Sequence, residues 1–217
     1  LVKPGWGWRP ASAYPDSRLP APFTPYRFRT ADSFAPRALV MPARRFFLLT
    51  QGYIVTFDAF DFDPRIMSGV KRAGYAEPTP IQTQAVPEVL AGRDVMGLAQ
   101  TGSGKTAAFA LPILQNMLAA GARPRGPLKT LVLAPTRELA LQTHESFVAL
   151  GRETGLRSAS VFGGVGFGPQ IKALKQASIC VACPGRLLDL VQRGQADLRQ
   201  VEIVVLDEAD RMLDMGF

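Results

Sequence analysis

The sequence predicts an α/β domain with a parallel sheet that is covered by helices on both faces. From about residue 57, short apolar runs alternate with longer segments in which apolar side chains recur at helical spacing. A helix between consecutive strands is typical of parallel connections. Because such sheets bind ligands at the carboxyl ends of their strands, we expect the functional residues to lie there.

Each expected element rests on a local signal. Residues 64–73 carry apolar side chains at helical spacing and end at Gly74, and residues 81–90 end at Ala91-Gly92. The expected strands are short apolar runs bounded by polar or turn-forming residues. The predicted helices are 64–73, 81–90, 105–119, 137–150, 170–175 and 186–193, and the predicted strands are 94–99, 131–134, 158–162, 179–182 and 203–206.

The first 54 residues differ from the remainder. They hold eight of the 18 prolines, eight Lys and Arg side chains and two acids, whereas residues 55–217 hold 17 basic and 16 acidic side chains. Because prolines at this density oppose helices and central strands, we predict a disordered or irregular basic leader, 1–54, before a globular domain, 55–217. The net charge of +7 therefore indicates no domain-wide nucleic-acid surface, although a flexible basic arm binds RNA non-specifically.

No apolar run approaches the roughly 20 residues that a membrane-spanning helix needs. The run from Arg44 to Leu48 superficially matches a twin-arginine export signal, but the apolar stretch behind it is short and is broken by Gln51-Gly52. We therefore expect a cytoplasmic location and no membrane partner.

The two cysteines, Cys180 and Cys183, form a Cys-x-x-Cys that allows metal or redox chemistry. No second cysteine pair completes a zinc site. Residues 178–183 predict a buried strand instead, with the two thiols on opposite faces. His144, the only histidine, is expected at a solvated helix position.

A glycine-rich segment lies between a predicted strand and a predicted helix. It matches the P-loop pattern of Gly, four residues, Gly-Lys and Ser or Thr, except that Ala99 takes the first glycine position. Gly102 and Gly104 allow the backbone to point several N–H groups at one anion, and the helix start adds its positive dipole end. Lys105 is predicted to reach the terminal phosphates of a nucleotide, and the hydroxyl of Thr106 to bind Mg²⁺.

Acidic residues follow the last predicted strand. Because they leave the sheet at its carboxyl edge, Asp207 is placed to hold Mg²⁺ directly or through water, and Glu208 to orient or deprotonate an attacking water. The predicted catalytic residues are thus Lys105, Asp207 and Glu208.

The run Asp207-Glu208-Ala209-Asp210, the phosphate loop and residues 74–82 together resemble motifs of the DEAD-box RNA helicases. From Phe57 to Phe217 the motifs follow the order of that family's first RecA-like domain. The resemblance implies a RecA-like fold with ATP and Mg²⁺ as cofactors, in which Gln82 reads the adenine edge and Phe57 stacks on the ring. The nucleotide-binding residues that it implies are Phe57, Thr79, Gln82, Thr101, Gly102, Ser103, Gly104, Lys105 and Thr106, with Thr106 and Asp207 directed at the metal.

Three further segments resemble RNA-binding motifs of the same family. They are residues 135–139, a glycine doublet, and residues 183–187, in which Cys183 stands where the family usually has Thr. In the family these segments hold the RNA sugar-phosphate backbone, which carries no sequence code. The RNA-binding residues implied are Pro135, Thr136, Arg137, Gly163, Gly164, Pro184, Gly185 and Arg186.

The resemblance also implies a second RecA-like domain, which this sequence does not contain. We expect a C-terminally incomplete first domain whose uncovered sheet edge favours aggregation, and ATP hydrolysis and unwinding only together with the second domain. The leading hypothesis is therefore an ATP-dependent RNA helicase module. The alternatives are a non-catalytic RNA- or protein-binding fragment and an unrelated P-loop ATPase, against which residues 74–82 argue.

Overall fold

The computed structural model describes residues 56–100, 102–123 and 126–216. All of them belong to the second of two compact units, Phe46–Phe217. The predicted leader and its boundary at residue 54 lie outside the described residues, as does Thr101 of the phosphate loop.

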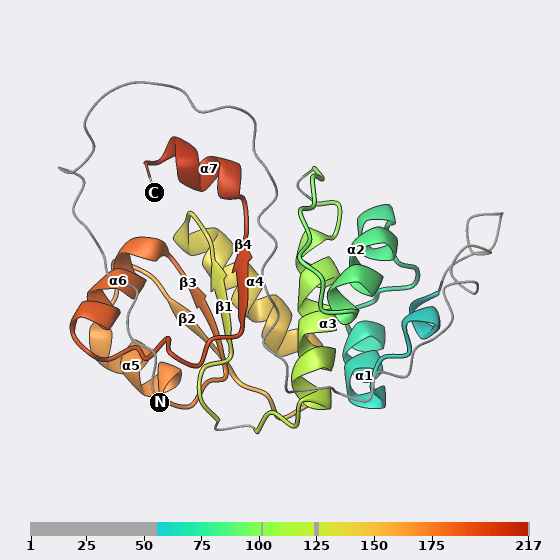
Figure 1. Ribbon diagram of the computed structural model, residues 1–217, viewed down its shortest axis with the longest axis horizontal. Helices are drawn as coiled ribbons and strands as arrows, with labels where there is room; N and C mark the ends of the chain where they lie inside the picture. The colour runs from blue at the N-terminus through green and yellow to red at the C-terminus, as the bar shows by residue number, and fades with distance from the viewer. Residues whose placement is uncertain (1–55, 101, 124–125, 217) are drawn as a thin grey trace, which may run out of the picture. The chain divides into compact units, whose positions relative to one another are not determined.

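The sheet has four parallel strands in the order β2-β3-β1-β4 (Figure 1). The central strand β1 places Thr130 opposite Ile179 of β3 and Ile203 of β4. All four carboxyl ends therefore lie at one edge of the sheet, and the predicted fold class is confirmed. The strands are β1 Thr130–Leu133, β2 Ser158–Val161, β3 Ile179–Ala182 and β4 Ile203–Leu206.

Helices follow the strands as the sequence predicts. All six predicted helices are present, and the two that follow β2 and β3 begin three and two residues earlier than expected. A short 3-10 helix, Phe57–Phe60, and the last helix were not predicted. The α-helices are α1 Pro64–Arg72, α2 Pro80–Leu90, α3 Lys105–Ala119, α4 Arg137–Leu150, α5 Phe167–Leu174, α6 Pro184–Gln192 and α7 Ala209–Asp214.

A hydrophobic core lies on each face of the sheet. Val132 and the paired Val181 pack with α1, α3 and α4, whereas Leu131 and the paired Cys180 pack with α5 and α6. The partly buried side chain of Cys183 packs against the first of these clusters. The two thiols thus lie on opposite faces, as the strand periodicity predicts.

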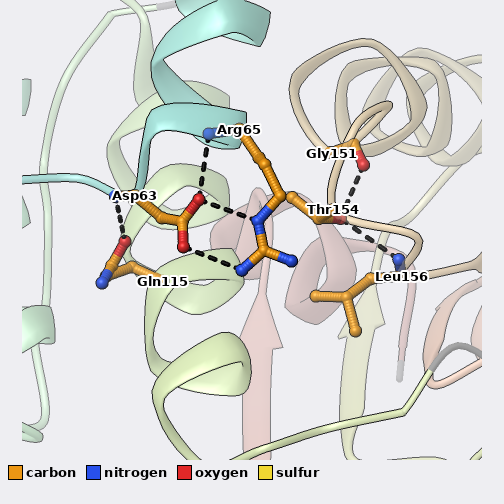
Figure 2. Close-up of polar contacts among 6 residues, drawn as sticks. All are labelled: Asp63, Arg65, Gln115, Gly151, Thr154 and Leu156. Carbon is orange, nitrogen blue, oxygen red and sulfur yellow. Dashed lines mark hydrogen bonds and ion pairs between the residues drawn. The ribbon is translucent and has the colours of Figure 1, made fainter.

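Polar contacts fix the start of α1 and the end of α4 (Figure 2). Asp63 accepts a hydrogen bond from the backbone N–H of Arg65 and is paired with its guanidinium, and its own N–H donates to Gln115 Oε1 of α3 over 2.8 Å. Behind α4, the Thr154 hydroxyl donates to the carbonyl of Gly151 over 2.6 Å. Asp63 therefore caps α1 and attaches it to α3.

The strand predicted at 94–99 is wrong. The backbone of residues 93–100 forms no strand, and the side chains of Met96 and Leu98 are 89% and 91% exposed. A strand needs a ladder partner, and no described strand pairs with β4 on its outer side. β4 is therefore an edge of the described sheet, and Val204 and Leu206 are exposed.

The expectation for His144 is also wrong. Its ring is half-buried between α4 and β2, and Nδ1 lies 2.8 Å from the hydroxyl of Ser158. Burial lowers the pKa of His144 below its ordinary value, and Glu145 partly opposes that shift.

Within the part of the chain that the structure describes, no helix has both the length and the apolar character needed to cross a bilayer.

Candidate functional site

The phosphate loop, residues 99–106, has the backbone that its glycines predict. Gly102 and Gly104 have φ angles of 82° and 90°, in the left-handed region that favours glycine. Gly104 is the N-cap of α3, so Lys105 is the first residue of that helix. The free N–H groups of the first helical turn are thereby available to an anion.

The side chain of Lys105 folds back across this loop. Its Nζ donates to the carbonyl oxygen of Ala99 over 2.7 Å. Thr106 follows in the first turn of α3 and is half-buried. The structure therefore places a cation and a hydroxyl at the start of α3, where the sequence predicts phosphate and Mg²⁺ binding.

Gln82 links α2 to the phosphate loop. Its side chain is only 3% exposed, its Oε1 accepts from the N–H of Thr79 over 3.0 Å, and its Nε2 donates to the carbonyl of Gly104 over 3.1 Å. Both polar groups of the amide therefore have partners within the protein. The adenine-reading role of Gln82 stays a prediction, and it requires the second lone pair or second N–H of that amide.

Two hydroxyl groups beside the loop are buried. Among the described residues, Ser103 Oγ makes no hydrogen bond, and Thr79 Oγ1 faces the backbone N–H of Gln82 as part of a capping box but makes no bond of normal geometry. Thr79 Oγ1 lies 3.1 Å from the position that a Cβ on Gly104 would occupy. Because a buried hydroxyl without a partner is costly, Ser103 fits a site whose ligand supplies hydrogen-bonding oxygens.

Phe57, the ring predicted to stack on adenine, is buried by other aromatic rings. It is 3% exposed, stacks with Tyr75 at a centroid distance of 6.1 Å, and meets Phe60 edge to face. Tyr75 is 39% exposed, and the sequence reasoning did not select it. Whether Phe57 stacks on adenine stays a prediction, and Tyr75 is an accessible ring in contact with it.

Asp207 lies at the carboxyl end of β4 and is 7% exposed. Its Oδ2 accepts from the Thr143 hydroxyl of α4 over 3.3 Å. Burial raises the pKa of Asp207, and the bond from Thr143 and the charge of Lys105 partly offset this rise. The Asp207 carboxyl is thus within electrostatic reach of the phosphate loop, and Thr143, which no motif marked, positions it.

Glu208 has a strained backbone at the same strand end. Its φ of 52° lies in the left-handed region, which is uncommon for a residue other than glycine. Its carboxylate lies 3.5 Å from the guanidinium of Arg211. Strain of this kind is concentrated at functional sites.

Few side chains at the carboxyl edge of the sheet could bind a metal ion. Within the described residues, no group of three or more His, Cys, Asp or Glu side chains could hold a metal ion. Mg²⁺ commonly uses one or two carboxylates together with phosphate oxygens. Asp207 and Thr106 therefore fit a metal that arrives with a nucleotide, and Cys180 and Cys183 form no metal cluster.

The predicted RNA-binding segments meet at the starts of three helices. α4 follows β1, α5 follows β2 and α6 follows β3, so their N-termini share the carboxyl edge of the sheet (Figure 1). Pro135 is buried, and the Thr136 hydroxyl accepts from the N–H of Leu139 as the cap of α4. At α6, Pro184 and Gly185 form the first turn. Helix N-termini at one edge favour anions.

Residues 162–166, here called the diglycine loop, lie between β2 and α5. The guanidinium of Arg137 lies over the ring of Phe162, 5.3 Å from its centroid. A Cβ on Gly164 would be only 2.5 Å from Arg137 Nη1, so glycine permits this contact. The structure thus brings together the start of α4 and the glycine doublet, which the sequence placed in separate motifs.

Both ends of the diglycine loop are held by one side chain. Gln170 accepts from the N–H of Phe162 and donates to the carbonyls of Phe162 and Gly166. Among the described residues, the N–H groups of 163–166 have no hydrogen-bond acceptor. Four successive N–H groups are therefore available to an external anion.

A parallel sheet with a glycine loop and an acidic strand end at its carboxyl edge defines a RecA-like α/β domain. Two solved structures share this fold. A DEAD box protein from the hyperthermophile Methanococcus jannaschii is 38% identical with a TM-score of 0.69, covering 74% of this chain and 43% of that chain. A hypothetical ATP-dependent RNA helicase from Sulfolobus tokodaii is 40% identical with a TM-score of 0.66, covering 72% and 44%.

The chain belongs to the DEAD/DEAH box helicase family, whose model matches residues 79–217. An ATP-dependent RNA helicase DBP2 from Ajellomyces capsulatus is 49% identical over 170 residues, which are 76% of this chain and 31% of that protein. A protein of the same name from Sclerotinia sclerotiorum is 48% identical over 76% of this chain and 29% of its own length. The chain thus spans about a third of the length of the curated relatives that it matches.

Proposed function

We propose that this chain is the ATP-binding module of an ATP-dependent RNA helicase, which binds ATP with Mg²⁺ and the RNA sugar-phosphate backbone. The observation that carries the proposal is the buried, unpartnered hydroxyl of Ser103 beside Lys105 in a glycine loop with left-handed φ angles. The relatives named ATP-dependent RNA helicases support it.

ATP phosphates would lie at the start of α3. Lys105 would exchange its bond to the Ala99 carbonyl for a bond to phosphate, and Thr106 with Asp207 would hold Mg²⁺. The metal would neutralise negative charge on the phosphate groups. Glu208, at the same strand end, would orient or deprotonate the attacking water.

Hydrolysis and unwinding would need a second RecA-like domain. Charge on a transferred phosphoryl group is stabilised by arginines that approach from outside the loop, and in comparable systems these contribute about 10³–10⁵ in rate. The chain covers about a third of its named relatives, so that domain belongs to the proposal for the longer protein.

RNA would bind by its backbone to the diglycine loop and the neighbouring helix starts. The four free N–H groups of residues 163–166 and the exposed Arg137 are phosphate ligands without a base code. We therefore expect affinity for single-stranded RNA to vary little with sequence and to fall with salt.

Nucleotide binding and turnover by the 217-residue chain test the proposal. We expect Mg²⁺-dependent binding of a fluorescent ATP analogue, at least tenfold weaker in Lys105→Ala and unchanged in the exposed control Lys175→Ala. We expect negligible ATP hydrolysis with or without RNA. An absence of nucleotide binding, or robust RNA-dependent turnover by the chain alone, would overturn the corresponding part of the proposal.

A non-catalytic RNA-binding fragment is the second candidate. The contacts that shape the diglycine loop come from Arg137, Gln170 and Arg186 of the chain itself, so this surface is formed without a nucleotide. RNA affinity that is the same with and without ATP, in a chain that binds no nucleotide, would favour this candidate.

A further inference from the structure

The diglycine loop is held from one side by an arginine that the sequence assigned to RNA. Arg186 Nη1 donates to the carbonyl oxygen of Val165 over 2.8 Å, and the Arg186 guanidinium carbon lies 4.1 Å from the centroid of the Phe167 ring. We propose that Arg186 is a positioning residue, which orders the diglycine loop through Phe167 and Val165 instead of contacting RNA phosphate. The RNA part of this inference rests on the proposed function.

The exposure of the two arginines separates their roles. The side chain of Arg186 is 11% exposed, and its shielded Nε makes no hydrogen bond among the described residues. That Nε lies 3.9 Å from Asp189 Oδ2 of the same helix, so its charge has an ion-pair partner within α6 and does not by itself require a ligand. Arg137, in contrast, is exposed. A guanidinium that is stacked, bonded and buried would have to leave its contacts to reach a phosphate.

Phe167 is the centre of this arrangement. It is the first residue of α5 and lies across one face of α6, because Arg193 also places its guanidinium carbon 4.5 Å from the Phe167 centroid. Arg186 and Arg193 are seven residues apart, about two helical turns, and therefore share that face. An aromatic ring in contact with two guanidinium groups attaches α5 to α6.

The consequence for the diglycine loop follows from its hydrogen bonds. Arg186 fixes the Val165 carbonyl, and Gln170 fixes the carbonyls of Phe162 and Gly166. With these carbonyls held, the unpaired N–H groups of 163–166 keep one arrangement before any ligand binds. Preorganisation of this kind lowers the entropy cost of binding an anion.

Uncharged substitutions at Phe167 test the inference in the full chain. We expect amide order parameters at 163–166 of about 0.85 in the wild type and below about 0.6 in Phe167→Leu, with Phe167→Tyr close to the wild type. Single-stranded RNA should bind Phe167→Leu several-fold more weakly with an unchanged salt slope, since no charge is removed, and Phe167→Tyr should restore the affinity.

Arginine variants separate positioning from phosphate contact. Arg137→Gln should lower the salt slope by about 0.7, the value for one lost contact to a single strand. Arg186→Gln should leave that slope unchanged, and the double variant with Phe167→Leu should bind no more weakly than the weaker single variant. A slope loss in Arg186→Gln equal to that of Arg137→Gln, or unchanged order parameters in Phe167→Leu, would overturn the inference.

The two proposals fail in different ways. If the wild type binds no RNA at low salt, RNA binding is refuted, whereas the order parameters of the free chain still decide whether Phe167 and Arg186 hold the loop. If Phe167→Tyr unfolds at the wild-type temperature but its amides at 163–166 are mobile, the inference is contradicted, because the aromatic ring is still present.

Discussion

The side-chain amide of Gln82 lies directly against the backbone of Gly104, with Nε2 3.1 Å from the carbonyl oxygen. This contact connects the first turn of α2 to the N-cap of α3. A Cβ on Gly104 would lie 2.5 Å from that same Nε2. The position therefore requires glycine twice, for its φ of 90° and for the approach of Gln82.

Replacing Gly104 by Ala tests this relationship. Gly92 provides a matched control, since its φ of 72° is equally left-handed but nothing lies within 4 Å of its missing Cβ. Each Ala variant should lose about 1–2 kcal/mol of unfolding free energy from backbone strain. Gly104→Ala should lose more than Gly92→Ala, as measured by urea denaturation.

The excess loss should come from the contact with Gln82. In a Gln82→Ala background, the excess should therefore fall to the small part that comes from Thr79 Oγ1, which lies 3.1 Å from the same Cβ position. An excess that is undiminished without the Gln82 side chain would show that the contact does not constrain the loop.

The backbone of Glu208 provides a second prediction. A φ of 52° is unfavourable for a residue with a Cβ. The free energy of unfolding of Glu208→Gly should therefore be about 1 kcal/mol larger than that of Glu208→Ala. Both variants lose the same contact with Arg211, so their difference isolates the backbone. Equal stability of the two variants in thermal or urea unfolding would contradict the strained conformation.

Local signals predicted most helices, and missing neighbours explain the one wrong strand. Residues 105–119 and 137–150 are helices with the predicted bounds, since each has a glycine or Thr136 at its N-cap. The run 94–99 has the composition of a buried strand, but strand formation depends on a partner that composition does not encode. Met96 and Leu98 are exposed because no described strand lies beside them.

The sequence selected residue types for the candidate site but did not predict the contacts between them. Lys105 and Asp207 lie at the predicted edge, but Thr143, which bonds Asp207, belongs to the interior of α4 and to no motif. Likewise, an arginine at the start of a helix suggests phosphate binding. Only the tertiary structure shows that the guanidinium of Arg186 already packs on the ring of Phe167. Long-range contacts of this kind are set by tertiary structure.

The thiol of Cys180 should be nearly inert in the folded chain. Burial raises the pKa of Cys180 to about 12, and burial also raises the pKa of the half-buried Cys183. At pH 8 the thiolate fraction of Cys180 is then about 10⁻⁴, and the thiolate is the reactive form. Ellman's reagent should therefore modify Cys180 only on unfolding. Rapid modification of two thiols in the folded chain would contradict the burial of β3.

Acid stability should depend on Asp63. The side chain and backbone N–H of Arg65 lower the pKa of Asp63 from 3.8 to about 2. Because the folded pKa is depressed, the stabilisation is present above about pH 4 and is lost as pH falls through about 2. Asp63→Asn keeps an N-cap acceptor but does not titrate, so its unfolding free energy should vary less with pH across that window.

Asp63→Ala is the matched control for the cap itself. It removes the acceptor as well as the charge, so it should be less stable than Asp63→Asn at every pH. If the unfolding free energy of Asp63→Asn falls with decreasing pH as steeply as that of the wild type, other carboxylates control the acid transition.

The edge strand β4 should drive self-association of the chain. Parallel strands are normally covered on both faces, yet Val204 and Leu206 are 59% and 56% exposed. A lysine at an edge position opposes pairing between two sheets. Val204→Lys should therefore reduce light scattering at concentrations where the wild type associates. Leu188 of α6 is equally exposed at 56% but is not on a strand, so Leu188→Lys should change association much less. An equal reduction in both variants would point to general surface hydrophobicity, and no reduction in either would remove the sheet edge as the cause.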